Sequence, residues 1–248
     1  MDIVNKAEAA GNLSIACDCA IACNVLKEYG IVPDRVSVVQ GGTVKTVWKV
    51  SSGSTPYCLK RLKHTIDKAL FSVNAQIHIK NSGGLVPGII PNRRGEPITQ
   101  YNGQLFVLYE WIAGKDLDFN VPADLRTAVR GLARFHLASK GYQAAESARV
   151  STKLGKWPDQ YMSMSKKLSS WKELAERSNP SQAFSSYLQH VDRMLALADK
   201  ALEALNASEY ARLAGQGSDR AVLCHQDYGK GNALAVGSSV YILDLDGV

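Results

Sequence analysis

The 248-residue sequence predicts an α+β protein with two lobes, an antiparallel sheet with one packed helix followed by a mostly helical lobe. The main observation is a change in hydrophobic periodicity, from period 2 in most of the chain before residue 112 to period 3.6 beyond it. The hairpin dipeptide Asn102-Gly103 supports the sheet. We therefore expect an N-terminal lobe over residues 1–112 and a C-terminal lobe over residues 113–248.

The N-terminal lobe is expected to begin with a helix over residues 14–29, because Gly30 and Pro33 follow it as helix-ending residues. A second helix is expected over residues 66–80, where the apolar side chains form one stripe. The strands are segments rich in β-branched residues between turn-forming residues. They are expected at 35–39, 46–50, 57–62, 98–101 and 104–109.

The C-terminal lobe is expected to contain three long helices, each with apolar side chains at helical spacing. They are predicted at 123–139, 160–176 and 181–206. After them the chain returns to two short apolar runs that flank a hairpin-length segment, and polar residues follow each run. The candidate functional residues of this lobe lie in that last part of the sequence.

Composition excludes several classes of function. The net charge of +6 comes from 29 basic and 23 acidic residues that are spread evenly along the chain, so no nucleic-acid partner is expected. No apolar run approaches the roughly 18 residues of a membrane span, so no membrane partner is expected either. The first residues lack a secretory signal, which predicts synthesis in the cytoplasm.

The residues after the last apolar runs have the pattern of a phosphoryl-transfer site. His225-Gln226-Asp227 is followed four residues later by Asn232, and the second run ends in Asp244-Leu245-Asp246. Such a site needs one carboxylate that accepts a hydroxyl proton, and an amide and a second carboxylate that hold a metal ion. The glycines between Asp227 and Asn232 allow the loop to fold back, so that both side chains converge. The alternative is a surface turn with incidental acidic residues.

Three neighbouring residues are candidates for supporting roles. We expect His225 to brace the loop by hydrogen bonding rather than to transfer a proton. Asp246 shares a strand face with Asp244 if the segment is extended, which predicts a supporting or metal-facing carboxylate. Lys230 is either a cation near the transferred phosphate or a solvated surface lysine.

The nucleotide would be bound by the N-terminal lobe. Lys60 ends the third strand and could reach phosphates as a compact positive charge, although a solvent-facing lysine is the alternative. Gly41 and Gly42 form a turn whose backbone amides could approach phosphates, or they serve the turn alone. The segment Glu110-Trp111-Ile112 at the lobe junction is either a hinge whose backbone pairs with an adenine edge or a simple linker.

This order of elements and motifs resembles the aminoglycoside phosphotransferase and choline kinase superfamily, which has a protein-kinase-like fold. Within it, the sequence is most similar to the spore-coat CotS/CotI group, and the resemblance covers nearly the whole chain from about residue 13. The supporting segments are 108–114, 131–136, 152–158 and 224–229.

The resemblance implies an ATP- and Mg²⁺-dependent phosphotransferase that transfers the γ-phosphate to a hydroxyl of an unknown small-molecule or protein acceptor. It implies Asp227 as catalytic base, Asn232 and Asp244 as Mg²⁺ ligands, and Lys60 as the contact to the α- and β-phosphates. Residues 110–112 would be the adenine hinge. It also implies a location in the spore coat, with other coat proteins as partners.

Two departures from the superfamily pattern make a second function possible. Kinases of this fold pair the strand lysine with a helix glutamate, but between Lys60 and Tyr109 the only acidic residues are Asp67 and Glu96, and neither lies mid-helix. The superfamily also continues past the Asp-x-Asp segment, so the C-terminal lobe is expected to be truncated. The alternative function is that of a non-catalytic, kinase-like structural protein of the spore coat.

Overall fold

The computed structural model describes residues 19–40, 46–150, 154–178, 182–216 and 221–248. The chain divides into two compact units, one of residues 1–151 with 222–248 and one of residues 152–221. The lobe boundary at residue 112 stays a prediction.

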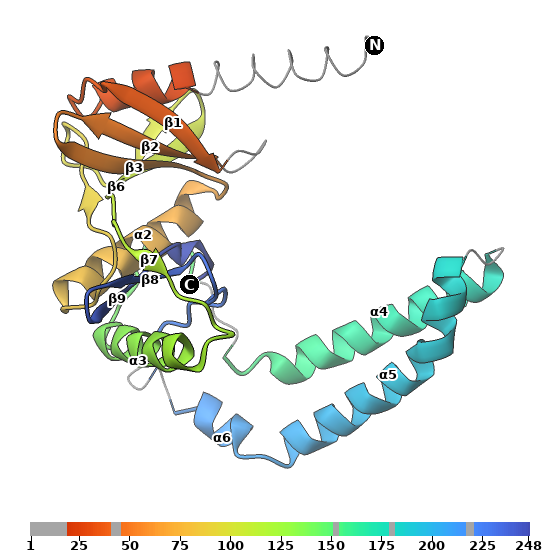
Figure 1. Cartoon of the computed structure of the whole chain (residues 1–248). Coiled ribbons are helices and arrows are strands. Elements are labelled where there is room, and N and C mark those ends of the chain that lie inside the picture. The colour runs from red at the N-terminus through yellow and green to blue at the C-terminus, as the bar shows by residue number, and fades with distance from the viewer. Residues whose placement is uncertain (1–18, 41–45, 151–153, 179–181, 217–220) are drawn as a thin grey trace, which may run out of the picture. The chain divides into compact units, whose positions relative to one another are not determined.

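The first unit is built on an antiparallel sheet of six strands (Figure 1). Four strands lie in the order β1–β2–β3–β6, and β4 and β5 both pair with β6. The strands are Arg35–Gln40 (β1), Thr46–Ser52 (β2), Thr55–Leu62 (β3), Ile89–Ile90 (β4), Thr99–Tyr101 (β5) and Gln104–Glu110 (β6). The predicted strands all form, and β4 is an addition.

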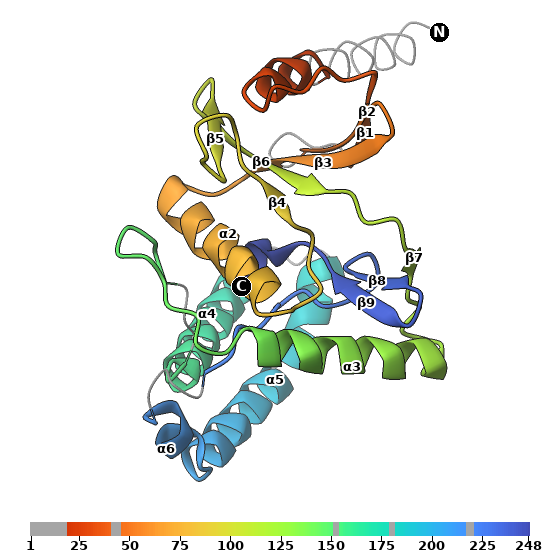
Figure 2. The ribbon, with the colours of Figure 1, turned by 90° about the vertical axis from the view of Figure 1, so that its left-hand side faces the viewer.

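A helix covers each face of this sheet, as Figures 1 and 2 show. Successive side chains of a strand point to opposite faces. Phe106 of β6 accordingly packs with Leu26 from the helical residues 19–27. Its neighbour Val107 packs on the other face with Val73 of α2 (Ile66–Asn81).

The same alternation determines the direction of Lys60 in β3. Cys58 and Leu62, two residues before and after it, both pack in the cluster that contains Val73 of α2. Lys60 therefore lies on the α2 side of the sheet.

A second, three-stranded sheet of the first unit carries the C-terminal segment. It has the order β7–β8–β9 and consists of Lys115–Asp116, Ala233–Val236 and Ser239–Ile242. Helix α3 (Pro122–Ala138) packs against β9 (Figure 2). A Cβ atom at Gly131 of α3 would lie 2.8 Å from Cβ of Val240, so only glycine permits this close approach.

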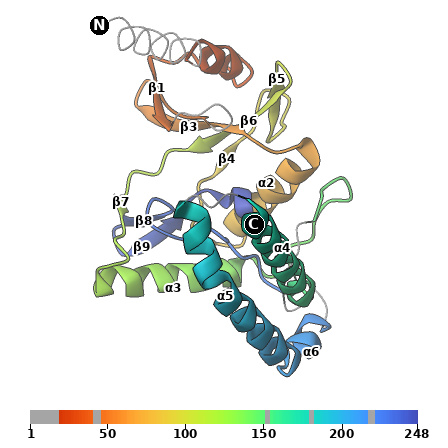
Figure 3. The same ribbon diagram turned by 90° about the vertical axis from the view of Figure 1, so that its right-hand side faces the viewer.

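The second unit is helical. It consists of α4 (Trp157–Arg177), α5 (Gln182–Asn206) and α6 (Tyr210–Ala214), and α4 and α5 lie side by side (Figure 3). Tyr187 Oη of α5 donates a hydrogen bond of 2.7 Å to the Leu168 carbonyl of α4. The described helices include none with the length and apolar character needed to cross a bilayer.

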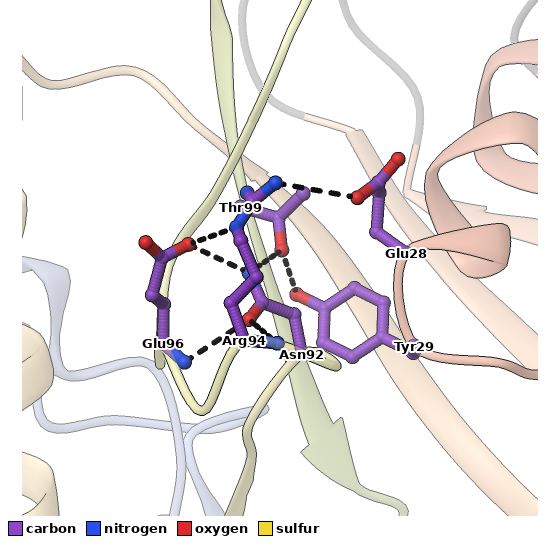
Figure 4. Close-up of polar contacts among 6 residues, drawn as sticks. All are labelled: Glu28, Tyr29, Asn92, Arg94, Glu96 and Thr99. Atoms are coloured by element: carbon purple, nitrogen blue, oxygen red, sulfur yellow. Dashed lines mark hydrogen bonds and ion pairs between the residues drawn. The ribbon is translucent and has the colours of Figure 1, made fainter.

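A polar cluster around the buried side chains of Asn92 and Thr99 joins the loop before β5 to the N-terminal helical segment (Figure 4). Asn92 is 5% exposed, and its Oδ1 accepts hydrogen bonds of 3.0 Å from the backbone amides of Arg94 and Glu96. Its Nδ2 donates to Glu96 Oε2 and Thr99 Oγ1. Thr99 in turn donates to Tyr29 Oη at 3.0 Å. One asparagine side chain therefore satisfies two backbone amides of this loop and connects it to β5.

We expect Asn92→Ala to lower the free energy of unfolding by about 2 kcal/mol, because two backbone amides lose their acceptor. Urea denaturation followed by circular dichroism would measure the change. Asn81→Ala, an exposed position at the end of α2, is the matched control and should change stability by less than about 0.5 kcal/mol. Equal stability of the two variants would contradict the role of the cluster.

Candidate active site

Lys60 is a buried cation held by two carboxylates. Its side chain is 7% exposed, and Nζ lies 2.6 Å from Asp244 Oδ1 and 2.7 Å from Asp246 Oδ2. Lys60 lies more than 180 positions before both aspartates in sequence, and they meet because β9 brings the C-terminal residues to the α2 side of the large sheet. The interpretation of Lys60 as a solvent-facing lysine is therefore wrong.

The Asp-x-Asp segment is not a strand, which corrects the expectation of a shared strand face. Strand β9 ends at Ile242, Asp244 has left-handed backbone angles of φ 60° and ψ 65°, and Asp246 lies in a 3-10 turn, η2 (Leu245–Gly247). Aspartate is among the few residues other than glycine that adopt this region readily. The left-handed backbone of Asp244 turns the chain. The carboxylates of Asp244 and Asp246 therefore both reach Lys60 Nζ although the segment is not an extended strand.

The loop before β8 brings Asp227 and Asn232 together. Asn232 Nδ2 donates to the Asp227 carbonyl at 2.8 Å and lies 3.4 Å from Asp227 Oδ2. The backbone amide of Asn232 donates a hydrogen bond to the Gly229 carbonyl, and Gly231 has a φ of 88°. A positive φ at that position is the reason the loop needs glycine there.

His225 connects this loop to the residue before Asp244. Its ring is 2% exposed, and Nε2 lies 2.6 Å from the Leu243 carbonyl, to which it must donate. The Leu243 amide donates to the Asn232 carbonyl at 3.0 Å. Within the described residues, His225 Nδ1 has no hydrogen-bond partner. This geometry supports a bracing role, since the histidine links the loop of Asp227 and Asn232 to the segment that carries Asp244.

Tyr228 and Lys230 point to other parts of the unit. Tyr228 Oη donates to the Ala128 carbonyl of α3 at 2.7 Å, and burial raises the pKa of Tyr228 to about 12. Lys230 is exposed and is not part of the cavity wall described next. The pKa of Asp118 is lowered, first by the hydrogen bond from the Asn120 backbone and further by the charge of Lys230. The charge of Lys230 therefore acts on Asp118, which is not among the described residues of the cavity wall.

A cavity of about 240 Å³ lies within the first unit, between the large sheet and the C-terminal segment. Its polar wall includes Lys60, Asn232 and Asp244. The residues of the predicted hinge, Glu110, Trp111 and Ile112, line it as well. The structure thus brings the candidate lysine, both candidate metal ligands and the candidate hinge to one cavity, and Asp227 adjoins it through Asn232.

The side chains of Glu110 and Trp111 make contacts with other residues of the first unit. The Glu110 carboxylate accepts hydrogen bonds from Lys80 Nζ at 3.0 Å and from the Gly88 amide at 2.8 Å. Partial burial acts to raise the pKa of Glu110, but these hydrogen bonds outweigh it and the pKa is lowered. Lys49 Nζ lies 4.6 Å from the centre of the Trp111 ring. Both side chains therefore have structural partners.

Helix α2 contributes a residue to the cavity that sequence reasoning missed. Gln76 is 4% exposed, lines the cavity, and donates through Nε2 to the Pro87 carbonyl at 2.7 Å. The prediction considered only acidic residues in this helix, so the neutral Gln76 was not among the candidates. Gly41 and Gly42 lie outside the described residues, and their predicted role is not addressed by the structure.

The residues present fit a divalent cation. Asp244 offers a carboxylate and Asn232 an amide oxygen, and hard oxygen ligands of this kind suit Mg²⁺, which usually binds through one or two carboxylates and substrate phosphates. No donor in the described part of the chain is hydrogen-bonded to Asn232 Oδ1. Groups of three or more His, Cys, Asp or Glu with metal-site geometry are absent among the described residues, so a cation here would also need nucleotide oxygens.

Cys58 offers a chemical probe of this cavity, because it lines the wall and burial raises its pKa to about 11. At pH 8 about one thiol in a thousand would be ionised, so we expect iodoacetamide to label Cys58 far more slowly than the exposed Cys224. ATP with Mg²⁺ should slow the labelling of Cys58 further and leave Cys224 unchanged. Peptide mass mapping over time measures both rates. Equal rates at the two cysteines would contradict the burial of Cys58.

Comparison with known proteins adds family information to this geometry. Residues 35–248 match the sequence profile of a family described as the phosphotransferase enzyme family. Spore coat protein S of Bacillus subtilis (strain 168) is 26% identical over 209 residues. The match covers 84% of this chain and 59% of that protein, so the chain spans about three fifths of the relative's length.

Two solved structures illustrate the similarity of fold. An aminoglycoside phosphotransferase from Alicyclobacillus acidocaldarius superposes with a TM-score of 0.67 at 17% identity, covering 90% of this chain and 65% of its own. Spectinomycin phosphotransferase, solved with ADP and spectinomycin, gives a TM-score of 0.64 at 20% identity, with coverages of 92% and 68%. The predicted protein-kinase-like fold is confirmed.

Proposed function

Because the chain belongs to the phosphotransferase enzyme family, we propose that it transfers the γ-phosphate of ATP to a hydroxyl group, with Mg²⁺ as the metal ion. The observation that carries this proposal is the single cavity lined by Lys60, Asn232, Asp244 and the hinge residues. A nucleotide needs all of these surfaces at once: a backbone edge for the base, a cation for the phosphates and oxygen ligands for the metal.

Each residue has a distinct role in the proposed reaction. Asp227 orients the acceptor hydroxyl and accepts its proton. Lys60 contacts the α- and β-phosphates, and the backbone of residues 110–112 pairs with the adenine edge. Asn232 and Asp244 would hold Mg²⁺, which when bound neutralises charge on the phosphate oxygens. His225 keeps Asn232 and Asp244 in register through the Leu243 carbonyl.

The acceptor is proposed to be a small molecule or a protein that carries a hydroxyl group. Among the proteins of similar fold, one was solved with spectinomycin and another is described as an aminopropanol kinase. The similarity to Spore coat protein S supports a location in the spore coat, with other coat proteins as partners.

A second candidate function is that of a non-catalytic, kinase-like protein of the spore coat. The observation that favours it is the pairing of Lys60 with both Asp244 and Asp246. In this arrangement the phosphate-binding lysine and the candidate metal ligand Asp244 bind each other instead of a nucleotide and a metal ion. In this case the cavity would bind nucleotide weakly or not at all.

Calorimetry with ATP, followed by transfer from γ-labelled ATP to a panel of alcohols, sugars and amino-alcohols, separates the two functions. The proposal predicts Mg²⁺-dependent binding with a dissociation constant in the micromolar range, about −8 kcal/mol, and label transfer to at least one acceptor. Chelation of the metal with EDTA should abolish transfer. Absence of nucleotide binding in the presence of Mg²⁺ would contradict the proposal and favour the scaffold.

A further inference from the structure

The two carboxylates that hold Lys60 differ in their relation to the cavity. Asp244 lines it together with Lys60 and Asn232, whereas Asp246 is absent from the described residues of its wall. Both carboxylates lie at nearly the same distance from Lys60 Nζ, 2.6 and 2.7 Å. Both carboxylates therefore contact the ammonium group, and Asp244 is the one that also belongs to the described cavity wall.

The backbone around Asp246 is fixed by packing against α2. Leu245 is 2% exposed and Val248 is 6% exposed, and both belong to a core cluster with Phe71 and Ile79 of α2. Two buried anchors on either side of Asp246 leave its carboxylate little freedom. Asp244 lies outside this pair of anchors, at the left-handed residue that precedes η2.

Helix α2 contributes no acidic residue to the described cavity wall. The residue of α2 that lines the cavity is the neutral Gln76, whose amide is bonded to the Pro87 carbonyl. Of the two acidic residues between Lys60 and Tyr109, Glu96 is bonded to Asn92 and Arg94 on the exposed loop before β5. The other, Asp67, lies in the first turn of α2, and a hydrogen bond from the Thr65 side chain lowers the pKa of its carboxyl group.

A buried ammonium group requires a carboxylate partner that stays in place during the catalytic cycle. Lys60 has two carboxylates within 2.7 Å, so it can keep one of them when the other binds a cation. Asp244 is the one that lines the cavity together with Asn232.

We propose that Asp246 is the positioning residue for Lys60 and leaves Asp244 available to bind the metal ion. This deepens the proposed function and rests on it, since it assigns the permanent partner of the phosphate-binding lysine. At the cavity, a turn packed on α2 thus supplies the carboxylate, and α2 itself supplies the neutral Gln76. Asp244 would hold the divalent cation, and Lys60 would keep Asp246 as its partner.

A double-mutant cycle on ATP affinity tests this pairing. Asp246→Asn should weaken ATP binding about tenfold when Lys60 is present and less than about twofold in a Lys60→Met background, as expected for partners that act as a unit. Isothermal titration calorimetry at saturating Mg²⁺ measures the four affinities. An equal loss in both backgrounds would overturn the proposal.

The Mg²⁺ dependence of ATP binding separates a positioning residue from a metal ligand. Asp246→Asn should leave the half-saturating Mg²⁺ concentration within about twofold of the parent, whereas Asp244→Asn should raise it about tenfold or more. A shift in Asp246→Asn as large as that in Asp244→Asn would overturn the proposal, because Asp246 would then bind the metal. Asp199→Asn on the exposed surface of α5 controls for the loss of one charge.

Failure of the proposed function has a different signature. If the parent chain binds no ATP, that function is contradicted, and the pairing is then tested through thermal unfolding. The melting-temperature losses of Lys60→Met and Asp246→Asn should be non-additive if the two residues are partners. Additive losses would overturn the pairing whatever the chain binds.

Discussion

Asp227→Asn should reduce the turnover number for phosphate transfer by about a hundredfold to ten-thousandfold, because an amide cannot accept the acceptor's proton. The substitution preserves the local structure, since Asn232 Nδ2 is bonded at 2.8 Å to the carbonyl of residue 227 and not to its side chain alone. Asp227 is also absent from the described cavity wall, so the dissociation constant for ATP should change by less than about threefold.

Steady-state assays with the best acceptor from the panel, together with calorimetry, measure these two quantities for Asp227→Asn. Asp199→Asn is the matched control and should match the parent in both. Transfer by Asp227→Asn at the parental rate would rule out Asp227 as the base. A loss of ATP binding as large as the loss of turnover would instead indicate a structural role.

Asp244→Asn should abolish Mg²⁺-dependent transfer, since the substitution removes the charged ligand that faces the cavity. The half-saturating Mg²⁺ concentration for ATP binding should rise about tenfold or more. Asparagine is the appropriate replacement, because residue 244 has a φ of 60° and asparagine tolerates this region. Asp244→Ala would add backbone strain of about 1 kcal/mol or more and confuse the comparison.

Lys60 should remain paired in Asp244→Asn, because Asp246 Oδ2 lies 2.7 Å from Nζ. The variant should therefore stay folded, which thermal unfolding would verify. Retention of parental Mg²⁺ dependence by a folded Asp244→Asn protein would show that the ion is held elsewhere.

The sheet and the helices were predictable because their residues repeat with the period of each element. The alternation in β6 placed Phe106 and Val107 on opposite faces, and α2 ends within one residue of its expected position. The candidate site was predictable to the extent that residue types and spacing determine chemistry. The structure does gather Lys60, Asn232, Asp244 and residues 110–112 at one cavity.

What could not be predicted depends on contacts between distant segments. The left-handed backbone of Asp244 has no periodic signature, so the segment was expected to be extended. The partner of Lys60 lies 186 residues further along the chain at Asp246, and no local pattern indicates such a pair. The Glu110 carboxylate accepts a hydrogen bond from the Gly88 amide, and glycine permits this approach because a Cβ at residue 88 would lie 2.7 Å from the carboxyl carbon.

The central claim is that Asn232 and Asp244 hold a nucleotide-bound cation and that Lys60 beside them contacts the phosphates. The most direct measurement is a crystal structure of the chain with a non-hydrolysable ATP analogue and Mn²⁺ in place of Mg²⁺, with anomalous diffraction data to locate the metal. We predict an anomalous peak between the Asp244 carboxylate and Asn232 Oδ1, with Lys60 Nζ in contact with the phosphates and with Asp246. A peak at another site, or an analogue bound away from the residue 110–112 hinge, would contradict the account.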